Sequence, residues 1–593
     1  MPEAIRRALP LVGVSAAALS WAVLFGWLAV NRHLAGGSHA EDLGWTDQVL
    51  NNFVRGQFFR MSIYQGAVWN TELDIQAIHR PDSLLAFHVE PMLLLLAPLY
   101  ALGGSVTFLV ALQALGFAAG AIPAYRIGSR LTRSRSVGVA LALVYLLSPF
   151  GQWAVLSDFH TSTLAAPLLL LTADFLLVAA PAWRTLCAAV LAASAREDVA
   201  PAVALLGLMA VLGIAVPRQR ALGVSMLLGG LAWTGVCALI IHAYAGATSP
   251  FAVRYGGVGE PGLVALLTRP IVLEYVKTLL LGGGWVALLA PFALLPALPS
   301  LLLNVLSSSD WMASGKAHYS TLVLPFLVVG AAMGLSRLAS RRTLFYGASA
   351  ALVATSGAAY LTAGAGPFAA NFAPATVTQH AVRAAAVADS LPLDAAVSAT
   401  SSLVPHLTRR ARVYEFPAVR DADYIFLDVK ASPAPTSAGD VFLRAQALLA
   451  EGGWNVDLAE DGLLLLHHVD GAPPTDAAPL GATLFPASGS NASPSSALTL
   501  VDAQLLSSTD GTIDVDGPRG ILHTTWRTPE VPLPPGSRLH FGLDLGTLGS
   551  RDVWDVASLW WNPPEAWPPD STITIDVPDI PAYRLRSWQA TPR

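Results

Sequence analysis

Long stretches without a charged residue recur from the amino terminus to about residue 382 of the chain. A helix needs about 20 consecutive apolar residues to cross a bilayer. The stretches of at least about that length are residues 8–31, 91–125, 136–157, 199–217, 221–253, 278–309, 317–336 and 343–382. A further apolar block, residues 161–195, is interrupted only by Asp174 and Arg184. Because the longer stretches can hold two crossings or one crossing and a re-entrant helix, we expect a multi-pass α-helical membrane protein with roughly eleven spans.

The first stretch follows Arg6 and Arg7 and is predicted to remain as an anchor. It exceeds the apolar region of a signal peptide, about 7 to 15 residues, and further spans follow it. Short arginine-rich loops mark the cytoplasmic side of a membrane protein. Such loops occur at residues 126–135, 218–220 and 337–342. With the amino terminus also inside, residues 32–87 are expected to form a large external loop.

The pattern changes after about residue 374, where the predicted transmembrane domain (residues 1–374) ends. Residues 375–470 combine short apolar segments with one helical pattern and are predicted to form a small α/β unit. Residues 471–496 are rich in Pro, Ala, Ser and Gly, as in a linker. Residues 497–593 alternate apolar and polar positions between Pro and Gly turns, which predicts an all-β sandwich. Both soluble units are expected on the external side.

Composition excludes several classes of protein. The chain is 54% hydrophobic and only 13% charged, whereas about a quarter of the residues in a soluble domain are charged. A net charge of −5 without a basic run gives no sign of nucleic-acid binding. Cys187 and Cys237 lie apart in apolar stretches, so they support neither a disulfide framework nor a zinc site. Walker, zincin and dinucleotide-binding motifs are also missing from the sequence.

Carboxylates and histidines stand at the predicted external ends of the spans. The first external loop begins with residues 41–48, whose carboxylates suit a general base or a divalent-cation site. Residues two apart in an extended backbone point to the same side. His88 with Glu90, and Asp158 with His160, are therefore expected to converge on a ligand. The alternatives are a solvated loop for the first segment and interfacial hydrogen-bonded pairs for the others.

Charged residues also interrupt the apolar pattern in the second half of the membrane domain. Arg196, Glu197 and Asp198 lie between two apolar segments, where ionisable groups usually face a cavity or a partner. Lys316 and His318 stand just before a predicted span, and a cation there would suit a phosphate. An internal pair between Arg196 and a neighbouring carboxylate, and an ordinary loop position for Lys316, are the structural alternatives.

These residues occur in an order that resembles a known family. The landmarks are Asp42-Leu43-Gly44, Asp47-Gln48, His88 to Pro91, Pro98-Leu99-Tyr100, Leu147-Ser148-Pro149, Asp158-Phe159-His160, Arg196-Glu197-Asp198, His318-Tyr319, Leu403 to His406 and Ala422 to Tyr424. Over about residues 40–430 they resemble a bacterial and archaeal family of predicted polytopic membrane proteins of unknown function, grouped with the GT-C superfamily of membrane glycosyltransferases. The resemblance implies a GT-C-like fold in the cytoplasmic membrane of a prokaryote.

GT-C enzymes move a sugar from a polyprenyl-phosphate carrier to an acceptor on the outer face of the membrane. The resemblance therefore implies hexosyl or pentosyl transfer, with a polyprenyl-phosphate sugar and membrane lipid as partners and a glycan, lipid or protein as acceptor. By its position, Asp42 would be the catalytic base that deprotonates the acceptor hydroxyl. Asp158 would be the catalytic acidic residue of the second external loop.

The resemblance also suggests residues for substrate binding. This set comprises His88, Glu90, His160, Arg196, Glu197, Asp198, Lys316 and His318. Arg196 or Lys316 would stabilise the charge that develops on the leaving phosphate. Some GT-C enzymes use a divalent cation, and Mg or Mn here would have Asp42, Asp158 and His160 as candidate ligands. The chain departs from related enzymes in its order Glu41-Asp42 and in the Val-Glu-Pro that follows His88.

Two other functions fit the same sequence features. A carrier or flippase for a lipid-linked sugar would use the same charged residues without bond chemistry, although no inverted repeat is visible in the sequence. A non-catalytic envelope assembly protein would use its external sandwich to bind a glycan. Retention of the membrane core with loss of function on deleting residues 497–593 would indicate the second of these alternatives.

Overall fold

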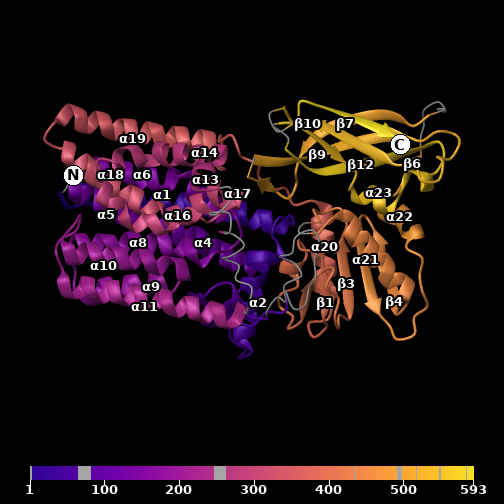
Figure 1. Ribbon diagram of the computed structural model, residues 1–593, viewed down its shortest axis with the longest axis horizontal. Helices are drawn as coiled ribbons and strands as arrows, with labels where there is room; N and C mark the ends of the chain where they lie inside the picture. The colour runs from indigo at the N-terminus through magenta and orange to yellow at the C-terminus, as the bar shows by residue number, and fades with distance from the viewer. Residues whose placement is uncertain are drawn as a thin grey trace. The chain divides into compact units, whose positions relative to one another are not determined.

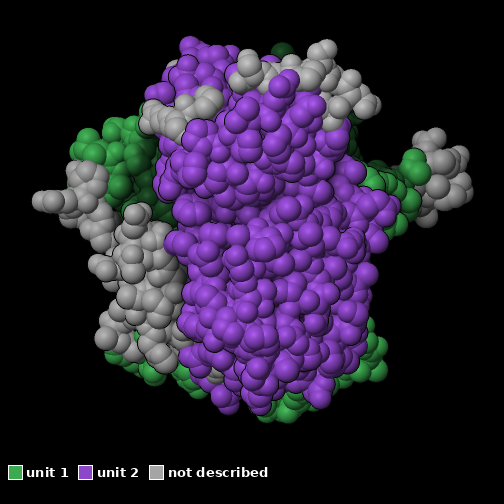
Figure 2. Space-filling view, turned by 90° about the vertical axis from the view of Figure 1, so that its right-hand side faces the viewer, with its two compact units in different colours: residues 1–30, 53–59, 83–372 green, residues 31–52, 60–82, 373–593 purple. Residues whose placement is uncertain are grey.

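The computed structural model describes residues 3–63, 82–245, 255, 262–433, 436–489, 497–515, 517–546, 549–581 and 584–592. The chain forms two compact units, whose elements are labelled in Figure 1. The first unit contains residues 1–30, 53–59 and 83–372. The second contains residues 31–52, 60–82 and 373–593 and is drawn in purple in Figure 2. All described strands belong to the second unit, and the first unit is helical.

The helices of the first unit follow the charge-free stretches of the sequence. They are α1 (Glu3–Leu34, whose last residues belong to the second unit), α3 (Met92–Ala101), α4 (Val106–Ala119), α5 (Ala121–Thr132), α6 (Arg135–Leu147), α7 (Pro149–Leu156), α8 (Thr161–Leu177), α9 (Ala182–Ala193), α10 (Ala200–Leu212), α11 (Arg220–Ala245), α13 (Leu263–Leu267), α14 (Pro270–Leu279), α15 (Trp285–Ala287), α16 (Leu298–Leu306), α17 (Asp310–Ala313), α18 (Leu324–Leu338) and α19 (Arg342–Ala363). Ser105 and Ser134 cap the starts of α4 and α6 with their hydroxyls.

Helix α18 lies at the centre of the first unit. Every residue from Leu324 to Leu335 is buried, as expected of a helix that is apolar on all sides. Helices α5, α6, α8 and α19 pack against it. By contrast, α1 has one buried face and one exposed face. The exposed face carries Leu19, Val23 and Trp27, each more than half exposed, which is the surface that lipid would cover.

Several helices are suited to crossing a membrane. Among the described residues, four helices are long and apolar enough, namely Ala8–Leu34, Val106–Thr132, Arg220–Ala245 and Arg342–Ala363, and the bent pair α6 and α7 could be a fifth. Shorter apolar helices accompany them. The helical, apolar body expected from the sequence is present. The number of roughly eleven spans and the inside-outside orientation stay predictions.

A mixed sheet in the second unit lies where the sequence predicts an α/β unit. Its strands are ordered β2-β1-β3-β5-β4, with β1 (Val397–Ala399), β2 (Val413–Glu415), β3 (Tyr424–Asp428), β4 (Trp454–Glu460) and β5 (Leu463–His468). Strand β1 pairs in parallel with β2 and β3, while β5 is antiparallel to β3 and β4. The helices α20 (Gln379–Ser390) and α21 (Ala438–Glu451) accompany the sheet.

The carboxy-terminal region contains two further sheets around one hydrophobic core. Their strands are β6 (Ser488–Gly489), β7 (Thr499–Ser507), β8 (Ile513–Asp514), β9 (Gly517–Arg527), β10 (Leu539–Asp544), β11 (Ser550–Val553), β12 (Ser571–Pro581) and β13 (Ser587–Pro592). One sheet has the order β11-β10-β13, and the other β6-β12-β9-β7 with β8 beside β9. Alternate residues of β9, β10 and β12 enter the shared core. Helix α22 (Ala478–Leu484) and β6 fall within the stretch predicted as a linker, and α23 (Ala557–Trp561) follows β11.

Residues predicted to belong to the first external loop are part of the second unit. Helix α2 (Trp45–Val54) begins there, and the buried carboxylate of Asp47 accepts a hydrogen bond from the hydroxyl of Thr408. Gln48 exchanges hydrogen bonds with Ser62, whose hydroxyl donates to the carbonyl of Val413 on β2 at 2.8 Å. The start of the expected loop is therefore built into the α/β sheet, while its residues 64–81 lie outside the described residues.

Candidate functional site

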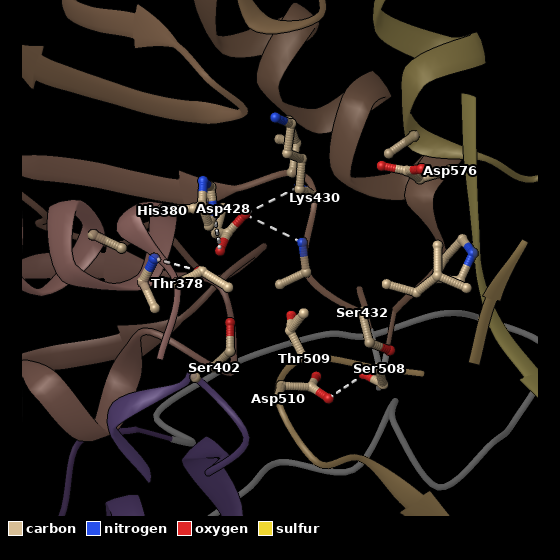
Figure 3. A pocket seen from close by; sticks show the side chains of 18 of the residues that line it. Thr378, His380, Ser402, Asp428, Lys430, Ser432, Ser508, Thr509, Asp510 and Asp576 are labelled. Carbon is tan, nitrogen blue, oxygen red and sulfur yellow. Dashed lines mark hydrogen bonds and ion pairs between the residues drawn. The ribbon is translucent and has the colours of Figure 1, made fainter. Parts of the chain in front are cut away.

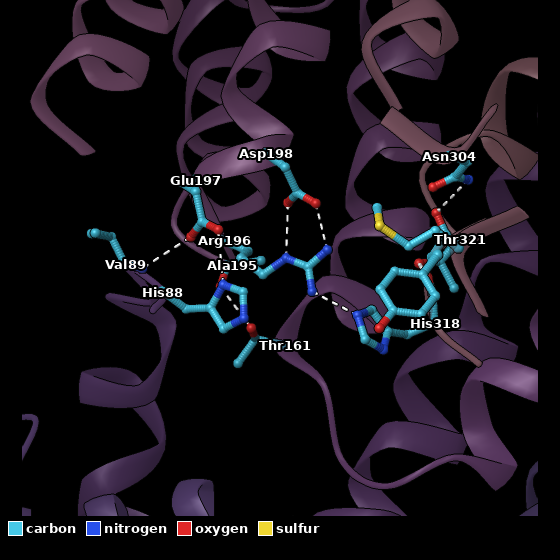
Figure 4. A network of polar contacts seen from close by, with 12 residues as sticks. His88, Val89, Thr161, Ala195, Arg196, Glu197, Asp198, Asn304, His318 and Thr321 are labelled. Carbon is cyan, nitrogen blue, oxygen red and sulfur yellow. Dashed lines mark hydrogen bonds and ion pairs between the residues drawn. The ribbon is translucent and has the colours of Figure 1, made fainter. Parts of the chain in front are cut away.

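A network of charged and aromatic side chains forms where loops of the first unit meet the ends of apolar helices. It draws on the segments before α3, between α7 and α8, between α9 and α10, and before α18. Figure 4 shows His88, Arg196, Glu197, Asp198 and His318 in this network. Placing polar groups among apolar helices costs free energy unless they are paired. The partners of each side chain therefore indicate which groups are structural and which can bind a ligand.

Glu197 fixes the segment that precedes α3. One of its carboxylate oxygens lies 2.8 Å from Nδ1 of His88, and the other accepts a hydrogen bond from the backbone N–H of Val89 at 2.9 Å. Glu197 begins a single 3-10 turn, and the residue before it is extended. This change of backbone conformation sends neighbouring side chains of the triplet in different directions. His88 therefore pairs with Glu197, 109 residues away, and the convergence of His88 and Glu90 on a ligand stays a prediction.

Arg196 is enclosed within the network, with a side chain only 8% exposed. Its Nε donates to Oδ1 of Asp198 at 3.0 Å, and Nη2 is close to Oδ2 of the same carboxylate. Its Nη1 lies 2.8 Å from Nε2 of His318. Because a guanidinium has no acceptor, Nε2 of His318 must accept this bond and cannot itself carry a proton. The pair between Arg196 and Asp198, given above as the structural alternative, is present. It also orients the guanidinium of Arg196 toward His318.

His160 lies against His318. The two rings stack with their centroids 3.6 Å apart. Nδ1 of His160 donates to the backbone carbonyl of Asp158 at 2.8 Å, so the two residues singled out by their spacing are joined by a hydrogen bond. Asp158 is itself buried. The structure thus brings His160, His318 and Arg196 into one continuous row of planar groups.

A tight loop holds His318 in this row. Gly315 and Ala317 both have positive φ angles, 72° and 56°. A Cβ atom at Gly315 would lie 2.9 Å from the ring of Phe150, so the close approach requires glycine as much as the dihedral angle does. Lys316 projects from the same loop, with its ammonium 5.6 Å from the centre of the Trp153 ring, a distance at which a cation is attracted to the aromatic face.

The loop before α3 carries two groups whose protonation is shifted. Burial lowers the pKa of His88, but the charge and hydrogen bond of Glu197 outweigh it and leave the pKa above 6.5. Burial also raises the pKa of Glu90, and the nearby positive charges of His88 and Arg196 only partly oppose that effect. Both groups therefore hold a proton more readily than they would in water, which suits proton exchange with a ligand hydroxyl or phosphate.

Asp42, the expected base, belongs to the second unit. It has φ 63° and ψ −79° in a kink where the N–H of Gly44 bonds to the carbonyl of His39 at 3.2 Å. The N–H of Ala40 donates to the hydroxyl of Ser401 at 3.2 Å and ties the kink to the α/β sheet. Backbone strain of this kind costs about 1–3 kcal/mol and clusters at functional sites.

The described residues contain no group of three or more His, Cys, Asp or Glu side chains placed to hold a metal ion. Among the candidate ligands, Nδ1 of His160 is turned toward the carbonyl of Asp158. The Mg or Mn site implied by the resemblance stays a prediction, and no step below is routed through a metal.

A family model described as "Predicted membrane protein (DUF2079)" matches residues 38–465. The chain belongs to this family. Every candidate residue from Asp42 to His318 lies in the matched range. The matched range also includes residues 40–48 and residues 401–408, which contact each other through Asp47 and Thr408 and through Ala40 and Ser401. The family match therefore spans both compact units.

Two crystal structures of ArnT from Cupriavidus metallidurans are similar to the chain. The structure bound to undecaprenyl phosphate is 13% identical, with a TM-score of 0.47, and the comparison covers 79% of this chain and 100% of ArnT. The apo structure is 14% identical, with a TM-score of 0.40 and coverage of 77% and 100%. None of the curated proteins compared with the chain matches it. Because the similarity to ArnT is this low, the site is assigned only from the contacts within this chain.

Sequence reasoning missed the residue that positions the Asp158–His160 loop. Gln113 on α4 is completely buried, and its oxygen accepts a hydrogen bond from the N–H of His160 at 2.7 Å. Its nitrogen donates to the carbonyls of Ala154 and Asp158 at 3.1 and 3.3 Å. The sequence did offer a signal, a single amide side chain inside an apolar helix. Burying such a group costs free energy unless it has hydrogen-bond partners.

Proposed function

We propose that this protein is a membrane glycosyltransferase of the GT-C type, which moves a sugar from a polyprenyl phosphate to an acceptor on the extracytoplasmic face. The observation that carries the proposal is Arg196, a buried arginine held by Asp198 and His318 at the ends of apolar helices. The alternatives, a carrier for the same lipid-linked sugar and a glycan-binding assembly protein, are separated from it by the experiment described below.

The pairing of Arg196 supports recognition of a phosphate. Asp198 and His318 engage its Nε and one N–H on each terminal nitrogen. Within the part of the chain that the structure describes, each terminal nitrogen keeps one further N–H, and two such donors can bind two oxygens of a phosphate group. A lipid phosphate also places its chain among apolar helices and its charge at their ends. Arg196 would thus bind the donor and stabilise the charge on the departing phosphate.

The proposed chemistry needs a base and a leaving group. The acceptor hydroxyl oxygen attacks the anomeric carbon of the sugar, the bond from that carbon to the phosphate oxygen breaks, and polyprenyl phosphate leaves. A carboxylate takes the hydroxyl proton. Asp42 is proposed as that base, with Asp158 as the second catalytic carboxylate. His88, Glu90 and Lys316 are proposed to contact the donor, as are the remaining members of the network, His160, Glu197, Asp198 and His318.

The test is release of polyprenyl phosphate by the full chain in nanodiscs, supplied with polyprenyl-phosphate hexoses and pentoses and a mixture of acceptor hydroxyls. Arg196→Lys keeps the charge but cannot form the paired bonds to Asp198 while reaching His318, so release should fall by about a hundredfold. Arg269→Lys is the matched control. Arg269 is also a mostly buried arginine paired with an aspartate, Asp310, at 3.1 Å, and its substitution should leave the rate within about threefold.

Three results would contradict the proposal. Tight binding of the lipid-linked sugar without release would favour the carrier. Release that is unchanged in both Asp42→Ala and Asp158→Ala would remove their catalytic roles. Binding of neither donor nor free polyprenyl phosphate, in protein whose thermal unfolding is normal, would leave the glycan-binding alternative.

A further inference from the structure

The second unit contains a cavity that the proposed transfer does not use. Its volume is about 520 Å³, within the range of about 300–1,000 Å³ typical of small-molecule sites. One wall comes from α20, the loop after β1 and the loop after β3. The opposite wall comes from β7, β9 and β12 and from the segment that leads into α23. All of these elements belong to the second unit.

Two buried hydroxyls in the cavity wall have no hydrogen-bond partner among the described residues. Ser402 follows β1 and is 5% exposed, and Ser558 is in α23 and is 7% exposed. Among the described residues, neither hydroxyl makes a hydrogen bond. A buried polar group without a partner costs about 1–3 kcal/mol, so a bound molecule that pairs with these hydroxyls would recover that energy. Figure 3 shows Ser402 pointing into the space lined by the labelled residues.

Three carboxylates line the same cavity, and each accepts hydrogen bonds from the protein through one of its two oxygens. Asp576 accepts from Nδ1 of His523 at 2.6 Å, and Asp579 accepts from the hydroxyl of Ser432 at 3.1 Å. Asp510 is fixed by the N–H of Thr512 at 2.8 Å. In each case the hydrogen bonds within the described chain use a single carboxylate oxygen. The other oxygen of each carboxylate can accept a hydrogen bond from a ligand.

The balance of charge selects among ligand classes. The lining contains five carboxylates, namely Asp428, Asp510, Asp555, Asp576 and Asp579, against Lys430 and three histidines, of which His380 pairs with Asp428 and His523 with Asp576. This excess of negative charge disfavours phosphates and uronic acids. Apolar side chains, Leu506, Ile521 and Phe485, complete the wall. A molecule with many hydroxyls, each able to donate and accept, and with apolar C–H faces would satisfy both kinds of surface.

We infer that this cavity is a binding site for a neutral saccharide. The fixed carboxylates accept hydrogen bonds from sugar hydroxyls, Ser402 and Ser558 exchange hydrogen bonds with them, and the apolar wall covers the C–H faces. The inference does not rest on the transfer reaction proposed for the first unit, because binding at this cavity requires no lipid-linked donor.

The test uses the full chain in nanodiscs and neutral oligosaccharides of glucose, galactose, mannose, rhamnose or xylose, with binding followed by saturation-transfer NMR and calorimetry. We expect at least one neutral oligosaccharide to bind, and oligosaccharides of the anionic glucuronic acid to bind more weakly. Ala381 on α20 lines the cavity, whereas its neighbour Val382 is 51% exposed and does not. Ala381→Phe should weaken binding by at least about tenfold, and the matched Val382→Phe should leave it unchanged.

A second pair of variants separates binding from folding. Ser402→Ala removes a hydroxyl that makes no hydrogen bond within the described chain, so it should weaken binding by about tenfold without lowering the thermal unfolding midpoint. Ser398 is equally enclosed, but its hydroxyl donates to the carbonyl of Ala418 at 2.8 Å. Ser398→Ala should therefore lower the unfolding midpoint and leave affinity unchanged.

Any of three outcomes overturns the inference: no neutral oligosaccharide binds the wild-type chain, a charged sugar binds more tightly than every neutral one, or binding survives both Ala381→Phe and Ser402→Ala. A loss of polyprenyl phosphate release in Arg196→Lys with saccharide binding intact would concern the proposed transferase alone.

Discussion

Nη1 of Arg196 and Nε2 of His318 are 2.8 Å apart although 122 positions separate the two residues in the chain. This contact joins the loop between α9 and α10 to the loop before α18. It also fixes the tautomer of His318, since the arginine can only donate. The same ring stacks on His160, so one hydrogen bond orients a row of planar groups that includes the proposed phosphate-binding arginine.

The coupling between Arg196 and His318 can be measured with a double-mutant cycle. We expect Arg196→Ala, His318→Ala and the double variant to show a coupling energy of about 1–2 kcal/mol in thermal unfolding, because each single variant removes the partner of a buried polar group. Arg269→Ala combined with His318→Ala is the control pair, and its effects should add. Additive effects for Arg196 and His318 would mean that the contact contributes nothing to stability.

Gln113→Leu should destabilise the first unit by about 2–3 kcal/mol, because it leaves the N–H of His160 and the carbonyls of Ala154 and Asp158 without their partner. Chemical unfolding in detergent would measure the loss. Gln219→Leu is a suitable control, because Gln219 ties the carbonyl of Leu176 at 3.0 Å from a partly exposed position. An equal effect of both substitutions would argue against a special role for Gln113.

Asp174→Asn should lower stability by about 2 kcal/mol. Asp174 on α8 is fully buried and pairs with Arg126, at 2.8 Å, and with Arg130 on α5. Removing one partner of a buried ion pair is costly, although both arginines are partly exposed and moderate the loss. The shift in unfolding midpoint would measure it.

The control for Asp174→Asn is Glu274→Gln, since Glu274 and Lys277 form a pair in which both side chains are more than half exposed. That substitution should change stability by less than about 0.5 kcal/mol. A similarly small effect of Asp174→Asn would show that the pair between α5 and α8 is dispensable.

The stability of the second unit should depend on pH through His380. Burial lowers the pKa of this residue, but hydrogen bonds and charges of Asp428 and Asp461 outweigh it and raise the pKa to about 9. Because the folded pKa is above the unfolded value of 6.5, the stabilisation is fully present below that pH. It is lost as the pH rises through about 9.

His380→Gln should remove this pH dependence and lower the stability near pH 6 by on the order of 2 kcal/mol. His467→Gln is the control, because the Nδ1 of His467 is 3.7 Å from Asp457 and both side chains are about 40% exposed. Unfolding of the full chain, measured between about pH 6 and pH 10, would separate the two. An unchanged pH profile in His380→Gln would contradict the assignment.

Local features of the sequence predicted most of the elements. Helices α1, α11, α18 and α19 fall on charge-free stretches, because crossing or filling an apolar layer requires uninterrupted apolar residues. Strands β1, β2, β3 and β5 fall on the short apolar segments of the predicted α/β unit. The charged triplet at Arg196 was also detectable, since a charge between apolar segments stands out without knowledge of the fold.

The partners of these residues were decided by the tertiary structure. Spacing along the chain drew attention to His88 and Glu90, but it could not show that packing of the loops would bring His88 to Glu197. Spacing also could not show that Asp47 would bond to Thr408, or that Ser402 and Ser558 would border one cavity. Apolar periodicity is a property of neighbouring residues, whereas a hydrogen bond across more than a hundred positions exists only after the helices and sheets have packed. The sequence by itself therefore determined the membrane character, the elements and the presence of exceptional charges, and the tertiary structure decided which of those charges meet.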